Sequence, residues 1–291
     1  MNTSRRMFLK QTGAASALLL LSPKNMFAAS NASNMIGLQL WTVKEDAAKD
    51  FDGTLKHIAE VGYNNVELFG YNKGMYFGKT IQETKALLEK YKLKSTSAHV
   101  AINDFLFNND EDSLKKAIDD AKTLGHDYLT QPWLAEDKRS IETFKMLADK
   151  FNKAGEACKK AGLKFAYHNH NFEFVKADGT CGYEVLLKGT EKDLVSYEMD
   201  LYWVVFSGEK PDEWFKKYPG RFPMWHVKDI SKAANHESTE VGAGTVNFKE
   251  IFTHKKEAGF VNFFVEQEAF ANMPPAQAIE ADYKYVKANL V

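Results

Sequence analysis

Four short segments of the sequence place metal-ligating residue types at the ends of apolar runs. They are residues 167–173 (Tyr-His-Asn-His-Asn-Phe-Glu), 199–200 (Met-Asp), 225–229 (Trp-His-Val-Lys-Asp) and 265–266 (Val-Glu). Imidazole and carboxylate groups are common protein ligands of divalent cations. Because each apolar run has the pattern of a β-strand, side chains from separate strand ends can converge on one ion. The nearby lysine and tryptophan side chains also suit the binding of a polyhydroxy substrate.

The rest of the sequence alternates strand-like and helix-like segments. The predicted strands cover residues 35–41, 65–69, 93–100, 128–131, 163–168, 194–200, 222–227 and 263–266. The predicted helices cover residues 51–61, 81–91, 112–124, 140–161, 183–188, 211–217, 248–258 and 275–290. Eight such units are what a (β/α)8 barrel requires. An open doubly wound sheet is the alternative, but it normally carries a glycine-rich turn after the first strand, and residues 40–44 contain no glycine. We therefore predict an α/β fold, a single-domain TIM barrel spanning residues 31–291.

In a barrel of this kind, functional side chains gather at the carboxyl ends of the strands. The fifth predicted strand offers three metal ligands, His168, His170 and Glu173, and the residues alone leave the choice among them open. Residues two apart on a strand share a face, so Glu198 and Asp200 point to the same side. The candidate site residues at or near strand ends are Trp41, Glu67, His99, His168, His170, Glu173, Asp200, His226, Lys228 and Glu266.

Three of these candidates, Asp200, His226 and Glu266, are the strongest metal ligands, and each also has an ordinary structural alternative. Asp200 could cap a helix that begins at Leu201. His226 could be a hydrogen-bonded core histidine. Glu266 follows an apolar run and needs a partner if it is ionised, which an ion pair with Lys228 would supply. The set as a whole indicates a site more strongly than any single member does.

Composition excludes several other classes of protein. The chain has 291 residues, of which 44% are hydrophobic and 26% charged, as is ordinary for soluble globular proteins. The net charge of −1 gives no general surface for nucleic acid or anionic membranes. Two cysteines, Cys158 and Cys181, lack zinc-site spacing, and we expect unpaired thiols. The tryptophans near strand ends, residues 41, 133, 203 and 225, are either sugar platforms or core residues.

The first thirty residues have the pattern of an export signal. Two adjacent arginines, Arg5 and Arg6, precede Phe-Leu-Lys, a short apolar run covers residues 13–22, and small residues follow at 28–30. This pattern is typical of twin-arginine signals, and the apolar run is short for a membrane span. We expect residues 1–30 to be removed, the protein to be periplasmic, and no stable membrane insertion after cleavage. An uncleaved amphipathic anchor is the alternative.

Taken together, these segments and Val-Gly-Ala-Gly-Thr-Val-Asn-Phe at 241–248 resemble the xylose isomerase-like TIM barrels, the sugar phosphate isomerase/epimerase superfamily. The resemblance covers about residues 35–290. It implies one divalent cation, often manganese but also magnesium, cobalt or zinc, held by one residue from each of strands five to eight. The last three ligands correspond to Asp200, His226 and Glu266. Where the family commonly has a glutamate, this sequence has His168. Either His168 replaces it or Glu173 supplies the ligand, and we favour Glu173 because a third carboxylate suits manganese or magnesium.

The resemblance further implies a sugar or keto-sugar isomerase or epimerase working through an enediolate. Glu266 or Glu173 would then be the base and the other the acid. The expected substrate contacts are Trp41, Glu67, His99, His168, His170 and Lys228.

Two other functions remain as alternatives. One is a metal-dependent lyase or dehydratase acting on keto-sugars or 3-keto-glycosides. The other is an exported carbohydrate-binding protein without turnover. In each case the expected partner is a small sugar rather than nucleic acid, and self-association into an oligomer is left open.

Overall fold

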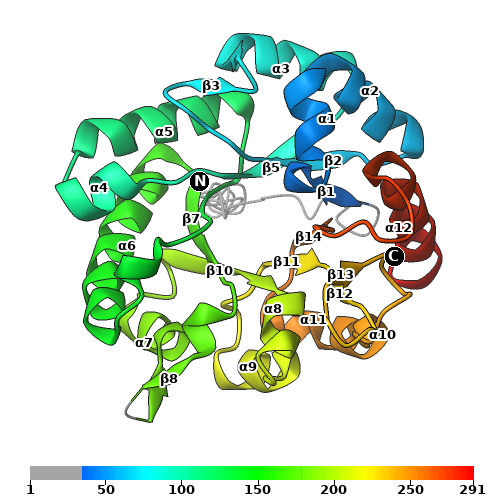
Figure 1. The fold of residues 1–291 in the computed structure, drawn as a ribbon. Helices are drawn as coiled ribbons and strands as arrows, with labels where there is room; N and C mark the ends of the chain where they lie inside the picture. Colours follow the sequence, from blue (N-terminus) through cyan, green and yellow to red (C-terminus); the bar gives the residue numbers. More distant parts are fainter. Residues whose placement is uncertain (1–34, 178) are drawn as a thin grey trace, which may run out of the picture. The chain divides into compact units, whose positions relative to one another are not determined.

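Eight parallel strands close into a barrel in the computed structural model, which describes residues 35–177 and 179–291 (Figure 1). Around the barrel the strands follow the order β1, β14, β11, β10, β7, β6, β5, β2. The closing pair joins distant parts of the chain, because Gly37 in β1 lies opposite Phe264 in β14. The strands are β1 Gly37–Gln39, β2 Asn65–Leu68, β5 Lys94–His99, β6 Tyr128–Gln131, β7 Lys164–His168, β10 Val195–Asp200, β11 Met224–Val227 and β14 Asn262–Val265. The predicted TIM barrel is confirmed, whereas the predicted export signal lies outside the described residues.

Helices surround the strands, and each predicted helix has a counterpart in the structure. They are α1 Lys44–Lys49, α2 Phe51–Val61, α3 Ile81–Lys90, α4 Asn103–Asn108, α5 Glu111–Leu124, α6 Ile141–Ala161, α7 Gly182–Gly189, α8 Leu201–Phe206, α9 Pro211–Lys217, α10 Phe248–Ile251, α11 Lys255–Ala258 and α12 Pro275–Asn289. The predicted helix at 248–258 is divided by a 3-10 turn, Phe252–His254. None of the described helices is long and apolar enough to cross a membrane.

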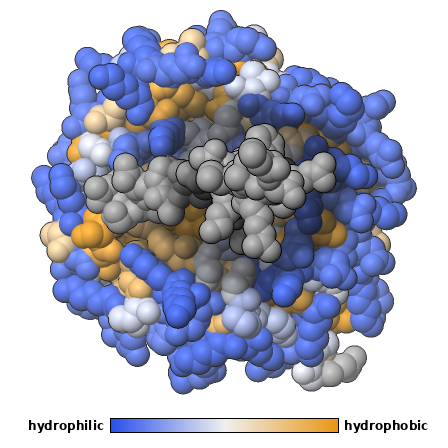
Figure 2. All heavy atoms as spheres, turned by 180° about the vertical axis from the view of Figure 1, so that it is seen from behind, coloured by the Kyte–Doolittle hydropathy of each residue, from blue (hydrophilic) through white to orange (hydrophobic). Residues whose placement is uncertain are grey.

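Local sequence explains where several helices begin and which face they bury. Thr80 and Glu83 form a reciprocal capping box at the start of α3. The side chain of Ser140 accepts a hydrogen bond from the backbone N–H of Thr143 at the start of α6, and Gly162 ends that helix with φ of 83°. The apolar faces pack on the strands, so hydrophilic residues cover most of the outer circumference in Figure 2.

The inside of the barrel is layered along its axis. Ala166, Met224 and Phe264, from three of the strands, form one buried apolar cluster with Tyr128. Two residues further along the chain come His168 in β7, His226 in β11 and Glu266 directly after β14. Side chains two apart on a strand share a face, so these three are expected on the same side as the apolar cluster. The inward-facing side chains therefore change from apolar to ionisable toward the carboxyl end of the barrel.

A glycine-containing loop supports this end of the barrel beside β11. The carboxylate of Asp229 accepts hydrogen bonds from the backbone N–H groups of Ile230, Gly242, Gly244 and Val246, at 2.8 to 3.1 Å. Gly242 has a left-handed φ of 89°. A Cβ atom at Gly244 would lie 2.3 Å from the Asp229 carboxylate. The Gly-Ala-Gly sequence therefore lets the loop wrap around one buried acid.

Candidate metal and substrate site

Three of the predicted ligands meet at the carboxyl end of the barrel. Asp200, His226 and Glu266, here called the ligand triangle, each offer a ligand atom, and these atoms lie within 4.8 Å of one another. Asp200 ends β10, His226 lies in β11 and Glu266 directly follows β14. All three are buried. His226 Nδ1 is 3.0 Å from Glu266 Oε2, and the ammonium of Lys228 is 3.7 Å from the same oxygen. This spacing and donor set could hold a divalent cation.

Asp200 caps a helix through one carboxylate oxygen, and its other oxygen makes no hydrogen bond within the described part of the chain. Its Oδ1 accepts hydrogen bonds from the backbone N–H groups of Tyr202 (2.8 Å) and Trp203 (3.3 Å), so it caps α8. Its Oδ2 is buried and has no hydrogen-bond partner among the described residues. Burial raises the pKa of Asp200 to about 7, against the opposing effect of Lys228. A buried carboxylate oxygen without a hydrogen bond is costly, and a cation beside Oδ2 would reduce that cost.

His168 is placed to complete the triangle. Its Nε2 lies 3.9 Å from Asp200 Oδ2, while its Nδ1 lies 3.1 Å from Glu198 Oε2. His226 is arranged in the same way, with Nδ1 toward Glu266 and Nε2 2.7 Å from Glu67 Oε2. Metal-bound histidines usually have the second ring nitrogen fixed by a carboxylate or carbonyl. Both imidazoles therefore have the surroundings of metal ligands.

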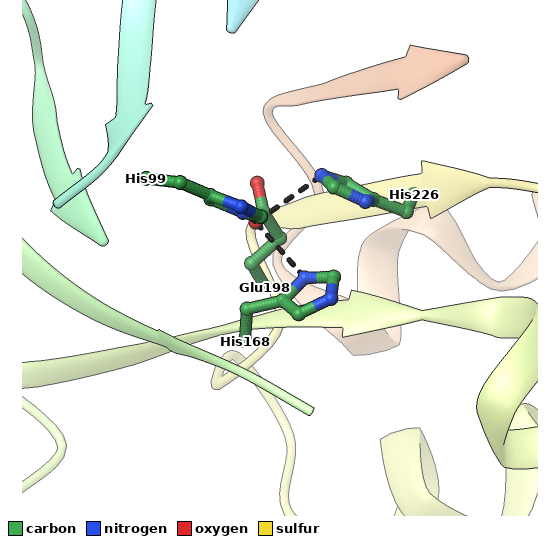
Figure 3. Close-up of side chains that lie close together, drawn as sticks. All are labelled: His99, His168, Glu198 and His226. Atoms are coloured by element: carbon green, nitrogen blue, oxygen red, sulfur yellow. Dashed lines mark hydrogen bonds and ion pairs between the residues drawn. The ribbon is translucent and has the colours of Figure 1, made fainter. Parts of the chain in front are cut away.

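A second group lies deeper, around Glu198 (Figure 3). One oxygen, Glu198 Oε2, lies 2.8 Å from His99 Nε2, 3.1 Å from His168 Nδ1 and 3.2 Å from His226 Nε2. These four residues also have positions that could hold an ion. Each nitrogen is already at hydrogen-bond distance from the carboxylate, however, so this group is better suited to orienting the imidazoles. Its central residue was not among the predicted site residues, although its shared face with Asp200 was a usable signal.

Charges in the deeper group depend strongly on one another. Burial opposes a charge on His226, but the carboxylates of Glu198 and Glu266 outweigh it and raise its pKa well above the ordinary value. Burial, together with the neighbouring His226, lowers the pKa of His168 to about 3. The surrounding carboxylates therefore favour a proton on His226, whereas burial favours the neutral form of His168.

Glu173 does not take the position expected of it as a metal ligand and catalytic group. Its Oε1 accepts a hydrogen bond from the Tyr167 hydroxyl at 2.6 Å, and its Oε2 accepts one from the backbone N–H of His170 at 2.8 Å. It belongs to neither group that could hold an ion. The chain turns back after β7, so this carboxylate anchors the turn instead of facing the ligand triangle. Of the two fifth-strand candidates, His168 is the one with a ring nitrogen 3.9 Å from a carboxylate oxygen of the ligand triangle.

A cavity of about 530 Å³ lies beside the triangle. Four predicted substrate contacts line it, whereas two others lie beneath it. Glu67 is fully buried against His226, and Lys228 is buried in contact with Glu268. The lining consists of Trp41, Phe69, Gly70, Tyr71, His99, Ala101, Pro132, Trp133, His168, His170, Trp203, Glu266 and Glu268.

The four tryptophans near strand ends divide between the two roles considered for them. Trp41, Trp133 and Trp203 line the cavity. Trp225 is fully buried, with its ring stacked on Phe215 at 5.1 Å. The two cysteines are both buried and unpaired, as expected.

Comparisons with known proteins show related sequences and folds. The chain is 30% identical over 158 residues to inosose dehydratase 2 of Bacillus cereus, and this match covers 49% of the chain and 51% of that protein. The chain thus spans about half the length of the curated relatives it matches. A sugar phosphate isomerase/epimerase structure from Parabacteroides distasonis is similar with a TM-score of 0.77 and 28% identity, covering 90% of this chain and 96% of that one.

A more distant structure shares the fold. The IOLI protein with a bound zinc atom is similar with a TM-score of 0.66 and 18% identity, covering 87% of this chain and 97% of that one. The family model for the xylose isomerase-like TIM barrel matches residues 55–289. On the strength of that match, the chain belongs to the xylose isomerase-like TIM barrel family.

Proposed function

We propose that the protein is a metal-dependent lyase of the dehydratase type that acts on keto-sugars. The observation that carries this proposal is the ligand triangle with His168 beside it, next to a cavity lined by carboxylate and imidazole groups. Similarity to inosose dehydratases supports elimination as the outcome.

Four residues would hold the ion: Asp200, His226, Glu266 and His168. Two carboxylates and two imidazoles form a mixed oxygen and nitrogen set that suits manganese, which we propose, and that also admits zinc or cobalt. A bound cation would act as a Lewis acid that draws electron density from the carbonyl of the substrate.

Glu266 is placed to accept the proton next to that carbonyl. It lines the cavity, and although burial opposes its charge, Lys228 and His226 hold its pKa below the ordinary value. Lys228 lies 3.7 Å from Glu266 and 3.9 Å from Asp200, so its positive charge partly balances these two carboxylates. Glu266 is therefore ionised at neutral pH and available as a base.

His99 is placed to donate a proton to the departing oxygen. It lines the cavity from the end of β5, and its Nε2 is held by Glu198 at 2.8 Å and lies 3.4 Å from Glu67. Burial opposes a charge on His99, but Glu67 and Glu198 raise its pKa, and the imidazolium form carries on its other ring nitrogen, Nδ1, the proton that would pass to a bound molecule. In the elimination, the C–H bond next to the carbonyl breaks and its electrons form a C=C bond. The C–O bond to the leaving group breaks, and that oxygen takes the proton.

An isomerase or epimerase is the second candidate, because the similar structure from Parabacteroides distasonis carries that name. Keto-sugars incubated in D₂O and followed by NMR separate the two outcomes. Isomerisation conserves mass, whereas elimination releases a second product. Chelation by EDTA should stop either reaction and added Mn²⁺ should restore it. Saturable binding with no turnover and no deuterium uptake would instead favour an exported carbohydrate-binding protein.

We also propose that residues 1–30 direct export by the twin-arginine route to the periplasm. The pair Arg5 and Arg6 is the sequence feature that supports this location. Replacing both arginines by lysine should leave the protein in the cytoplasmic fraction of a host that has this pathway. Unchanged periplasmic recovery of the variant would contradict the proposal.

A further inference from the structure

One side of the cavity is aromatic. Trp41 follows β1, Phe69 and Tyr71 follow β2, and Trp133 follows β6; these four residues are called the aromatic rim. Trp41 keeps 40% of its surface exposed and Trp133 keeps 45%. Large apolar side chains that are exposed together beside a cavity commonly mark a binding surface.

The two tryptophans of the rim are held in place although they are exposed. The ring of Trp41 meets Phe69 edge-on at 5.0 Å, and the ammonium of Lys44 lies 4.0 Å from its centroid. Beside Trp133, the guanidinium of Arg139 lies 5.1 Å from the ring and donates two hydrogen bonds to the carbonyl of Leu134. Two fixed aromatic surfaces lose little conformational freedom when a flat ligand packs on them.

The charge of the cavity lining disfavours phosphorylated sugars. No lysine or arginine is among the described residues that line it, whereas Glu266 and Glu268 are both part of the lining. Lys228 lies beneath, fully buried and engaged with Glu268. A phosphate group usually requires arginine, lysine or a ring of backbone N–H donors. The cavity therefore suits an uncharged ligand.

Size points to more than one sugar ring. Cavities of roughly 300–1,000 Å³ typically bury ligands of drug size, and this cavity is about 530 Å³. A single ring whose carbonyl lies at the ligand triangle would leave the aromatic rim for another group. The C–H faces of a pyranose ring, or an aromatic aglycone, pack well on tryptophan.

We propose that the substrate is a neutral, unphosphorylated keto-glycoside whose second ring packs on the aromatic rim. This inference rests on the proposed lyase function and names its substrate class. The second ring is the leaving group: its glycosidic C–O bond breaks, and its oxygen takes the proton donated by His99. The products are an unsaturated keto-sugar and the free alcohol of the second ring, with no oxidant or reductant required.

Kinetics with matched substrates test the proposal. The substrates are methyl 3-keto-glucoside, 4-nitrophenyl 3-keto-glucoside and the 6-phosphate of the methyl compound. The proteins are the metal-loaded wild type, Trp133→Ala and the control Met146→Ala, whose exposed side chain lies on α6. Trp133→Ala should raise KM for the nitrophenyl compound at least about tenfold, a loss of about 1.4 kcal/mol, and change KM for the methyl compound less than about twofold. The control should change neither.

Two results would overturn the substrate class. One is an equal effect of Trp133→Ala on both glycosides, or no effect on either. The other is a higher kcat/KM for the phosphorylated compound than for its neutral counterpart in the wild type.

Direct binding separates this inference from the proposed function. If no keto-glycoside is turned over, the lyase proposal fails. Calorimetry with 4-nitrophenyl and methyl β-glucosides, which lack the carbonyl, then measures binding to the aromatic rim without the reaction. The nitrophenyl compound should bind at least about tenfold more tightly, and Trp133→Ala should abolish the difference. Equal affinities of the wild type for the two glucosides would contradict the proposed role of the aromatic rim in binding the second ring.

Discussion

The two halves of the barrel mouth differ in the kind of side chain they offer and in where those side chains start. Strands β7, β10, β11 and β14 supply an ionic half: His168, Asp200, His226 and Glu266. The loops after β1, β2 and β6 supply the aromatic rim. The ionic residues lie on, or directly after, paired strands, where Asp200 is in register with His226. The rim residues lie beyond the strand ends. On the proposed function, the groups that need exact geometry would lie on the strands and the groups that select a ligand would lie on loops.

The two halves of the barrel mouth are in contact with each other below the cavity. Glu67 and His99 come from β2 and β5, on the aromatic side, yet both contact residues of the ionic half: His99 lines the cavity, and Glu67 is buried against His226. Glu67 contacts His226 at 2.7 Å and also accepts a hydrogen bond from Gln39 at 2.7 Å. The aromatic side therefore also supports the opposite half from beneath, and the two halves can be perturbed separately only with well-chosen variants.

Replacing Asp200 by Asn should break the ionic half most severely. The amide oxygen can still cap α8, but the negative charge beside the ion is lost. We expect loss of bound metal and at least about 100-fold lower kcat/KM, because even residues that only support metal ligands typically matter 10–100-fold. Metal analysis, kinetics and circular dichroism are the measurements. Asp193→Asn, at an exposed position, is the control. A variant with full metal content would remove Asp200 from the ligand set.

Replacing Glu67 by Gln tests support from the aromatic side. The variant keeps the shape but loses the charge that holds His226 Nε2. We expect metal affinity or activity to fall about 10–100-fold, without effect on binding of an aromatic glycoside to the rim. Metal titration and calorimetry check the two parts. Glu89→Gln, on the exposed face of α3, is the control. Unaltered metal affinity would show that the two halves are independent.

Glu173→Gln separates a loop anchor from a metal ligand. Both oxygens of Glu173 accept hydrogen bonds, and the glutamine NH₂ group cannot accept one of them. The free energy of unfolding should fall by about 1–3 kcal/mol while metal content stays complete. Urea unfolding and metal analysis measure the two effects. Loss of the metal from a folded variant would restore Glu173 to the ligand set.

The Asp282→Asn variant tests how the loop beside β11 contributes to the pH dependence of stability. The carboxylate of Asp282 accepts a hydrogen bond from the backbone N–H of Val241, and burial raises its pKa to about 8. The folded protein therefore holds this proton up to about pH 8, whereas the unfolded chain releases it near pH 4. The contribution to stability is complete below pH 4 and declines as pH rises to 8.

The Asn variant lacks this titration. Its Tm should vary less with pH between 5 and 8 and should be about 2–4 °C higher than that of the wild type at pH 8, equivalent to about 1 kcal/mol. Thermal unfolding across this pH range is the measurement, with Asp193→Asn as control. Parallel pH profiles for wild type and Asp282→Asn would contradict the expectation.

Sequence periodicity was enough to predict the fold and much of the ionic half. Strand–helix alternation carries the barrel, and the two-residue strand period places His168, His226 and Glu266 above an apolar layer. Glu198 lies on the same face as Asp200, but nothing in the sequence says that three imidazoles would converge on it. The hydrogen bonds that Glu173 accepts could not be predicted, because its position depends on how the chain turns after β7. The aromatic rim could not be predicted as a unit, since its members come from loops whose paths the sequence pattern does not determine.

The closure of the barrel by β1 and β14 has a consequence for the order in which the protein matures. Glu266 directly follows β14, which pairs with β1, so the ligand triangle cannot form until residue 266 has been synthesised and these two strands have paired. Such long-range pairing is slow to form. An ion that binds only the closed barrel stabilises it by mass action. Metal capture would therefore act as a late quality check, retaining chains that have closed correctly and leaving truncated ones without the ion.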